Sequence, residues 1–439
     1  MGRALALAII ACIASCYRSP SLASCKYRCG GANNDSCPSG YECNAGMCVA
    51  PGEGCDGDGG VIDAPPDDGD LTDGAIIDAP VCTNPNAPLW KRQPLSLPIG
   101  SNLMQIVAFD GNHDGVMDLA VLDSTTAIGF YAGNGDGTFD PRQTSNAGTG
   151  AKRLIAGDFD HDGSRNDLVV LQTGTMNALG VLVSNEDGTF TRTDVPFGSN
   201  AVDIANAGDV DGNTFEDIGI LFSGSSARIE LVLQIAASPF WQSGTMVGTN
   251  MMATSLTMGR VNSGMIPDAV VTMTGTNQFG MHAGSGNTYS LGAIVAWNVN
   301  AGPVDAAAAQ MRASGMPSVV TANQMANSVS LRHANGVNSF TDGGDFAMGT
   351  APKSVILANV GGTALPDILT ANSGESTFSV LLNQDPLVPS NWEPSIPIAT
   401  DLNPFDLVSA DFDGDGRVDV AVACQGSSTI VIYLNTCNP

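Results

Sequence analysis

The sequence predicts an all-β protein built from seven similar units, and three observations carry that prediction. An aspartate-rich segment recurs through residues 82–439, and its first position falls at 110, 158, 209, 260, 310, 359 and 411. The intervals between these positions are 48 to 52 residues. Around each segment, apolar residues alternate with a period of two over short stretches, as half-buried strands do. Four short strands in a unit of this length, repeated seven times, are typical of a seven-bladed β-propeller.

A second landmark repeats at the same spacing. Turns end at an aromatic residue, as at Phe139, Phe190 and Phe340, and each aromatic stands 19 to 21 residues before the next aspartate-rich segment. Trp90 stands 20 residues before Asp110 and begins this series. The last unit stops before its own aromatic strand. We therefore expect an N-terminal strand that starts at Trp90 to complete the last blade and leave no open sheet edge.

Cysteines flank the expected closure of the ring. Cys82 precedes the Trp90 strand and Cys437 follows the last strand of the chain. We expect a disulfide between them. Cys424 would then be left unpaired, as a buried thiol on a strand.

Composition excludes one large class of partner. The 439 residues include 44 acidic and 17 basic side chains, for a net charge of −27. Nucleic-acid binding needs clustered Lys and Arg, so no nucleic-acid partner is expected. The same charge argues against electrostatic docking to anionic lipid.

The first residues resemble an export signal. Residues 1–15 carry one arginine and an apolar run too short to span a bilayer. The segment from Ile13 to Cys16 resembles a bacterial lipobox, which predicts a lipid on Cys16 and a membrane anchor. The alternative is ordinary cleavage nearby without a lipid. Either outcome places the protein outside the cytoplasm, at the outer membrane or cell surface or in the medium.

Two small segments precede the repeats. Residues 16–55 hold six cysteines in a stretch too short for its own core, which predicts a disulfide-rich knob rather than a metal site, because the stretch has no histidine. Its disulfide connectivity stays open. Residues 56–81 are rich in Asp, Gly and Pro and are predicted to be an acidic, extended linker. The six knob cysteines are Cys25, Cys29, Cys37, Cys43, Cys48 and Cys55.

Four of the aspartate-rich segments have the spacing of calcium loops. Calcium takes six to eight oxygen ligands, and Asp or Asn at every second position can wrap around it. In the second loop one extra residue makes Asp167 one place late, so that Asn166 could serve instead. We predict about four structural calcium sites, whose ligands are Asp110, Asn112, Asp114 and Asp118; Asp158, Asp160, Asp162 and Asp167; Asp209, Asp211, Asn213 and Asp217; and Asp411, Asp413, Asp415 and Asp419.

These loops allow two other interpretations, an EF-hand and plain turns. An EF-hand needs a glutamate at loop position 12 and flanking helices, but Val121, Val169, Ile220 and Val422 stand there, inside alternating strands. The loops could also be plain Asp/Gly turns, although four crowded carboxylates repel one another without a cation. Three worn copies start at Arg260, Gln310 and Asn359 and are not expected to bind calcium well.

Residues 82–439 resemble FG-GAP or VCBS repeats, the blades of integrin α-chain propellers and of many bacterial surface proteins. The resemblance rests on the DxDxDGxxD form followed by an apolar strand. It implies a calcium-stabilised, non-catalytic binding or adhesion module that meets an extracellular protein or glycan ligand on the face away from the calcium loops.

Catalysis and sugar binding remain as alternatives. No HExxH, GxSxG or phosphate-binding glycine loop is present, and His282 and His333 fall in hairpin strands where they are expected at the surface. Some polysaccharide lyases use similar propellers, so a polysaccharide-acting enzyme is one alternative. A carbohydrate-binding propeller is the other, although four Trp and six Tyr are few for stacking platforms.

Overall fold

The protein is described here from a computed structural model of the whole chain. The described residues are 42–44, 47–49 and 90–436, without 94–95, 101, 175–176, 199–200, 236–240, 251, 263, 265, 286–289, 362–364, 384–391 and 393. The chain divides into two compact units, Met1–Pro65 and Pro66–Pro439. In the first unit, β1 (Glu42–Asn44) pairs antiparallel with β2 (Met47–Val49).

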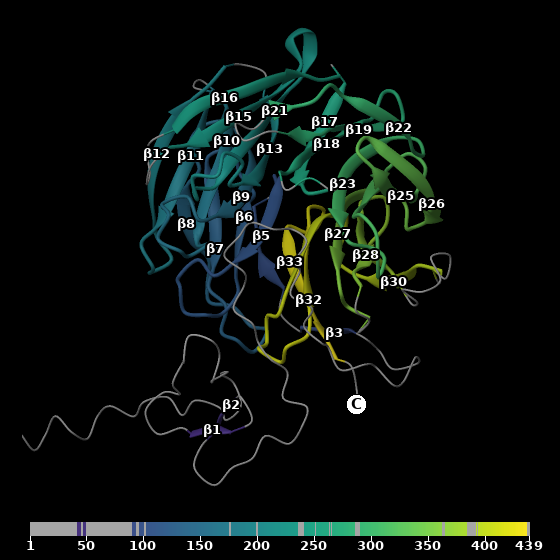
Figure 1. The fold of residues 1–439 in the computed structure, drawn as a ribbon. Coiled ribbons are helices and arrows are strands. Elements are labelled where there is room, and N and C mark those ends of the chain that lie inside the picture. Colours follow the sequence, from purple (N-terminus) through teal and green to yellow (C-terminus); the bar gives the residue numbers. More distant parts are fainter. Residues whose placement is uncertain are drawn as a thin grey trace, which may run out of the picture. The chain divides into compact units, whose positions relative to one another are not determined.

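The second unit contains seven antiparallel blade sheets, six of four strands and one of five, which confirms the predicted β-propeller (Figure 1). Each sheet is one blade. The first half of the chain forms three blades, each from four consecutive strands. Blade 1 is β5 (Gln105–Phe109), β6 (Asp118–Leu122), β7 (Ala127–Tyr131) and β8 (Gln143–Asn146); blade 2 is β9 (Ala151–Gly157), β10 (Asp167–Thr173), β11 (Asn177–Ser184) and β12 (Phe190–Pro196); blade 3 is β13 (Ala201–Gly208), β14 (Asp217–Phe222), β15 (Arg228–Gln234) and β16 (Trp241–Gly248).

The second half of the chain forms the other four blades. Blade 4 is β17 (Ala253–Gly259), β18 (Asp268–Met273), β19 (Gln278–His282) and β22 (Val295–Asn298), with β20 (Gly284–Ser285) and β21 (Ser290–Leu291) as an inserted hairpin. Blade 5 is β23 (Pro303–Ala309), β24 (Ser318–Asn323), β25 (Ser328–Gly336) and β26 (Ser339–Ala347). Blade 6 is β27 (Pro352–Ala358), β28 (Asp367–Asn372), β29 (Thr377–Leu381) and β30 (Ile396–Ala399); blade 7 begins with β31 (Pro404–Ala410), β32 (Asp419–Cys424) and β33 (Thr429–Asn435).

Blade 7 is completed from the other end of the repeats. Strand β3 (Trp90–Arg92) pairs antiparallel with β33, and β4 (Leu97–Pro98) pairs with it further along. Trp90 packs edge-on against Phe378 of blade 6 at a centroid distance of 5.7 Å. Arg92 also donates to Asp401 over 2.7 Å. The predicted closure by the Trp90 strand is therefore confirmed.

The first strand of each blade lines the axis of the ring. Each of these strands contacts the next, and β31 returns to β5, so that the yellow C-terminal strands lie beside the blue N-terminal ones in Figure 1. The second strands are buried along their whole length, for example β6 and β32. Apolar side chains from neighbouring blades form shared cores, because each blade can cover its faces only with the next one.

Some predictions fall outside the described residues. They are the export signal, Cys16, the disulfides of the knob, the linker, and the Cys82–Cys437 pair. Cys424 lies in β32 as a buried free thiol, as expected. Within the described part of the chain, we find no helix of the length and apolarity that a membrane crossing requires.

Candidate calcium loops and central channel

Four loops between the first and second strands of a blade share one backbone design. In the loop of blade 7, the Asp411 carboxylate accepts N–H groups of Gly414, Asp415 and Gly416 over 2.8 to 3.2 Å. Asp413 and Asp415 each accept the N–H two residues ahead. The carboxylates of Asp110, Asp158 and Asp209 accept equivalent backbone N–H groups. The side chains at loop positions 1, 3 and 5 therefore curl the loop by accepting backbone N–H groups in the same pattern in all four loops.

Left-handed backbone makes this curl possible. Loop position 6 has a φ of +82° at Gly115 and Gly416 and of +91° at Gly163. Only glycine adopts such angles without strain, whereas the third loop places Thr214 there at +76°. Gly416 thus permits the tight bend of the loop of blade 7.

The last aspartate of each loop has a second task. We call Asp118, Asp167, Asp217, Asp268, Asp367 and Asp419 the closing aspartates; all six side chains are fully buried. In Asp419, one oxygen accepts the Phe412 N–H over 2.9 Å and the other accepts the Asn435 N–H over 2.7 Å. The carboxylate thus ties the loop to the end of the third strand. Asp167, not Asn166, makes these contacts in the second loop, to Phe159 and Ser184.

Carboxylates converge in three of the four loops. One oxygen from each member of a triad lies within 4.8 Å of the other two, in Asp158/Asp160/Asp167, Asp209/Asp211/Asp217 and Asp411/Asp413/Asp419. In the first loop the third position is Asn112, and its amide donates to Asp114 over 2.9 Å. These oxygen donors fit calcium, which accepts Asp and Asn oxygens in flexible geometry.

Burial makes the charged form of the closing aspartates costly. Together with the charges of neighbouring loop aspartates, it raises the pKa of Asp118 to about 6 and those of Asp167, Asp217 and Asp419 to about 7. A divalent cation would favour the ionised carboxylates.

In the loop of blade 5, the side chain of Arg312 takes the place of these acids. The Arg312 guanidinium donates to the carbonyls of Met316 and Ala334 over 3.3 and 3.1 Å. Ser318 stands in place of the closing aspartate and shares a 2.8 Å hydrogen bond with His333 Nδ1. The fold of this loop therefore does not require a metal.

Both strand histidines differ from expectation. His282 and His333 are buried rather than at the surface, with relative exposures of 0% and 6%. His282 bonds the Gly292 carbonyl and the Thr249 hydroxyl. Their strands lie third in their blades, where both faces are covered by neighbouring sheets, and a hairpin position in the sequence does not reveal that coverage.

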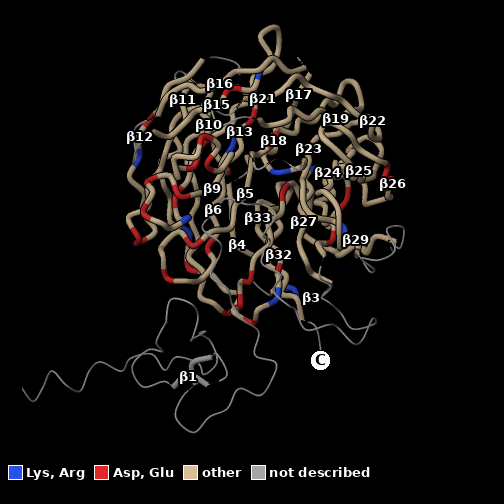
Figure 2. Tube along the Cα trace, in the orientation of Figure 1, with Lys and Arg blue, Asp and Glu red and all other residues tan. Residues whose placement is uncertain are grey.

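The acidic loops lie together on the ring. They belong to blades 7, 1, 2 and 3, which are consecutive because β31 contacts β5. Red segments in Figure 2 are accordingly dense along the side that carries β6, β10 and β32. Blades 4 and 5 instead carry Arg260 and Arg312 in their loops.

The loops of blades 1, 2 and 6 are also attached to the next blade. The carbonyl of loop position 2 accepts a side-chain donor from the following blade: Ser184 reaches Gly111, Gln234 reaches Phe159, and Asn435 reaches Val360. The N–H of the same loop residue is held by the closing aspartate of its own blade. A rigid loop thus supports the junction between two blades as well as its own sheet.

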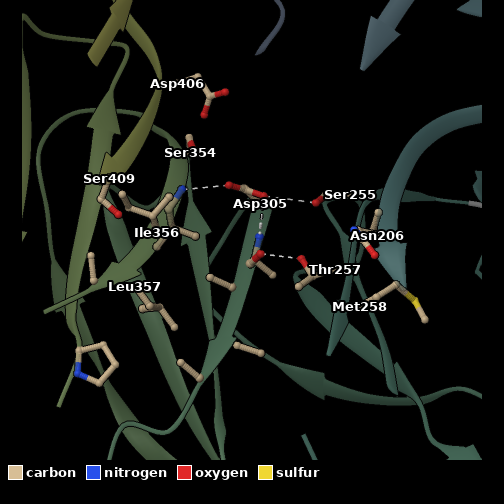
Figure 3. A pocket seen from close by; sticks show the side chains of 18 of the residues that line it. Asn206, Ser255, Thr257, Met258, Asp305, Ser354, Ile356, Leu357, Asp406 and Ser409 are labelled. Carbon is tan, nitrogen blue, oxygen red and sulfur yellow. Dashed lines mark hydrogen bonds between the residues drawn. The ribbon is translucent and has the colours of Figure 1, made fainter. Parts of the chain in front are cut away.

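The axis of the ring contains a cavity of about 1300 Å³, lined by all seven first strands (Figure 3). Near the start of these strands, one polar residue from each blade faces the cavity, and in six blades a register shift immediately precedes it. Such bulges re-aim side chains. These seven residues, which we call the belt, are Gln105, Arg153, Asp203, Ser255, Asp305, Ser354 and Asp406.

The belt bridges six of the seven blade junctions by hydrogen bonds within the described residues. Its acids and Gln105 accept a backbone N–H from the next blade: Leu154 bonds Gln105, Leu256 bonds Asp203, Val355 bonds Asp305 and Ile106 bonds Asp406, over 2.8 to 3.1 Å. Two of its donors reach the acid of the next blade, Arg153 to Asp203 and Ser255 to Asp305.

The sequence prediction missed the belt, although a signal was present. Belt residues recur at 105, 153, 203, 255, 305, 354 and 406, with the period of the loops. Each is a polar residue near the start of an otherwise apolar strand. The aspartate loops mark the repeat far more strongly than these single polar positions do.

Comparisons with known proteins identify the fold and no family. No protein-family model matches the chain, and no curated protein sequence matches it. Among solved structures, BBS1N in complex with ARL6DN superposes with a TM-score of 0.56 at 10% identity, covering 79% of this chain and 97% of that one. A putative 6-phosphogluconolactonase from Bacteroides uniformis gives 0.54 at 14% identity, with 73% and 95% covered.

A third similar structure is a catalytically inactive virginiamycin B lyase from Staphylococcus aureus with quinupristin. Its TM-score is 0.51 at 14% identity, with 79% of this chain and 99% of that chain covered. At such low identities these likenesses show a shared propeller architecture. Function does not follow from them, since one fold hosts many activities.

Proposed function

We propose that this protein is an exported, non-catalytic binding module of the FG-GAP/VCBS kind, whose propeller is stabilised by calcium in the loops of blades 7, 1, 2 and 3. One observation carries the proposal: four loops repeat the same curl of position 1, 3 and 5 side chains, three of them with converging carboxylates. Export and a lipid on Cys16 are supported by the first residues of the sequence.

Calcium would be held by the loop side chains and would act as a structural staple. The chain's own contribution is to present each oxygen with its backbone N–H bonds already made. A native-only site at a calcium concentration 100-fold above its dissociation constant adds about 2.7 kcal/mol to stability. The bridges from loop position 2 would carry this gain to the neighbouring blade.

Binding rather than catalysis suits the described site. The cavity residues are held in inter-blade hydrogen bonds, and the histidines of blades 4 and 5 are buried in structural pairs. The BBS1N structure contains a propeller domain with a bound protein, which supports protein recognition as one use of this fold. A carbohydrate ligand or a polysaccharide-acting activity is the second candidate.

Calcium counting tests the proposal. Native mass spectrometry of the full chain in calcium should show about four bound ions, and EDTA should lower the melting temperature. Asp411→Ala should remove one ion and reduce the stabilisation by calcium, whereas Asp140→Asn, an exposed residue beyond the loops, should change neither. A full complement of ions in Asp411→Ala, or equal melting with and without EDTA, would refute the stapling role.

A further inference from the structure

Within the described residues, two carboxylates in the central cavity form no ion pair. Asp203 is paired with Arg153 over 2.8 Å. Asp305 accepts backbone N–H groups and the Ser255 hydroxyl, and Asp406 accepts backbone N–H groups. Both side chains are partly exposed to the cavity (Figure 3).

We propose that the cavity binds a primary ammonium group at Asp305 and Asp406, carried by a small alkylamine or by a lysine side chain of a partner. This inference rests on the proposed binding function and names the class of ligand. Belt-level charge favours a cation, because three carboxylates face the Arg153 guanidinium and the Lys353 ammonium. The overall charge of −27 attracts basic partners in the same direction.

The wall next to these acids suits a methylene chain. Ala306 to Ala309 of β23 and Ile356 and Leu357 of β27 line the cavity below the belt. Figure 3 shows Ile356 and Leu357 on the same side as Ser354. Alkyl stems of lysine pack on such apolar surface while the charged head reaches polar groups.

Other ligand classes fit less well. Among the described residues, the belt acids do not form a triad with donor atoms close enough for one metal ion. A purely anionic ligand would meet Asp305 and Asp406, and Arg153 is already engaged by Asp203. Lys353 lies over the Phe405 ring at 5.4 Å, and like Arg153 it would repel an amine near these acids.

Titration of Asp305 agrees with this assignment. Burial, together with the charges of Asp406 and Asp203, raises its pKa to about 6. Arg153 and Lys353 also face this region. An ammonium ion would favour the carboxylate, so amine binding should weaken as the pH falls below about 6.

Calorimetric titration of the calcium-loaded full chain tests the proposal with three probes: pentylamine, Nα-acetyl-lysine methylamide and neutral pentanol. We expect both amines, but not pentanol, to bind. Asp406→Asn should weaken amine binding about tenfold, because a charged partner is lost. Lys353→Met should strengthen it about threefold by removing a repelling charge, and it breaks no belt hydrogen bond. Asp342→Asn, a 75% exposed outer carboxylate, is the matched control.

Weaker amine binding in Asp406→Asn together with stronger amine binding in Lys353→Met supports an ammonium site. A merely structural role of the belt would not change the two affinities in opposite directions. Binding of the lysine derivative alone indicates a partner side chain; binding of pentylamine alone indicates a small amine. Three results would overturn the inference: pentanol binding as tight as pentylamine binding, changes in amine affinity opposite to those expected for the two variants, or no amine binding. Calcium counts and melting distinguish the proposals: a calcium-stapled protein without amine binding refutes only this one.

Discussion

Asp367 shows what a closing aspartate does after the rest of its loop has changed. Its side chain is fully buried in blade 6, where the loop keeps no triad of acids. One oxygen accepts the N–H groups of Val360 and Gly361 over 3.0 and 2.8 Å, and the other accepts the Asn383 N–H over 2.7 Å. Three backbone donors would lose their partners without it, which explains a buried acid at a site that needs no metal.

The pH dependence of stability should reveal this residue. Burial raises the pKa of Asp367 to about 6, above the value of about 3.9 in the unfolded chain. Its stabilising contribution is therefore complete below about pH 4 and is lost as the pH rises through about 6. Asp367→Asn should lower the free energy of unfolding by about 1–3 kcal/mol at pH 5, because an amide has one acceptor oxygen where the carboxyl has two.

Denaturant unfolding in EDTA at pH 5 and pH 7.5 measures the effect. The difference in the free energy of unfolding between the native protein and Asp367→Asn should be smaller at the higher pH. Asp140→Asn serves as the exposed control. Equal pH slopes for the native protein and Asp367→Asn would show that Asp367 does not titrate as argued.

At the scale of the loop, the third copy departs from the others at loop position 6. Thr214 has a φ of +76° where the other three candidate calcium loops have glycine. A Cβ at Gly115, Gly163 or Gly416 would meet nothing within 4 Å. A side chain there would therefore cost free energy through the left-handed backbone and not through a steric clash. A left-handed conformation costs about 1–2 kcal/mol for a residue other than glycine.

Exchanging these residues should change stability in opposite directions. Thr214→Gly should stabilise by about 0.5–1 kcal/mol, after the larger loss of chain freedom by glycine is included. Gly416→Thr should destabilise by about 1 kcal/mol or more. Urea unfolding in calcium measures both. Destabilisation by Thr214→Gly would mean that the threonine side chain makes a contact worth more than its strain.

At the scale of the whole molecule, closure of the ring depends on a few residues far from the rest in sequence. Strand β3 and the short β4 cover the outer edge of β33, and the Arg92–Asp401 pair joins them to the segment before blade 7. The belt and the loop bridges connect the same blades nearer the axis. The ring is thus held at its outer edge by pairing and at its centre by hydrogen bonds.

Removing the closing strand should expose a sheet edge. A chain that starts at residue 82 keeps β3 and β4, whereas one that starts at residue 100 lacks both. We expect the shorter chain to melt earlier and to self-associate, because an unpaired edge recruits other strands. Light scattering after size-exclusion chromatography and thermal melts compare the two. A monomeric shorter chain with an unchanged melting temperature would show that β3 is dispensable for closure.

The repeat allowed the sequence alone to predict seven blades, the loops between their first and second strands, and the borrowed strand at Trp90. These features depend on local spacing and on hydrophobic period, which are written along the chain. The positions of the loop carboxylates at 1, 3 and 5 could be predicted for the same reason.

Only the tertiary structure decided which groups meet across blades. The belt from Gln105 to Asp406 joins residues about 50 positions apart, and its members face the cavity because bulges turn them inward. Burial of His282 and His333, and the double role of Asp419, follow from sheets packed on both sides. Spacing along the chain predicts an element, but burial and hydrogen-bond partners depend on the neighbouring blade that covers it.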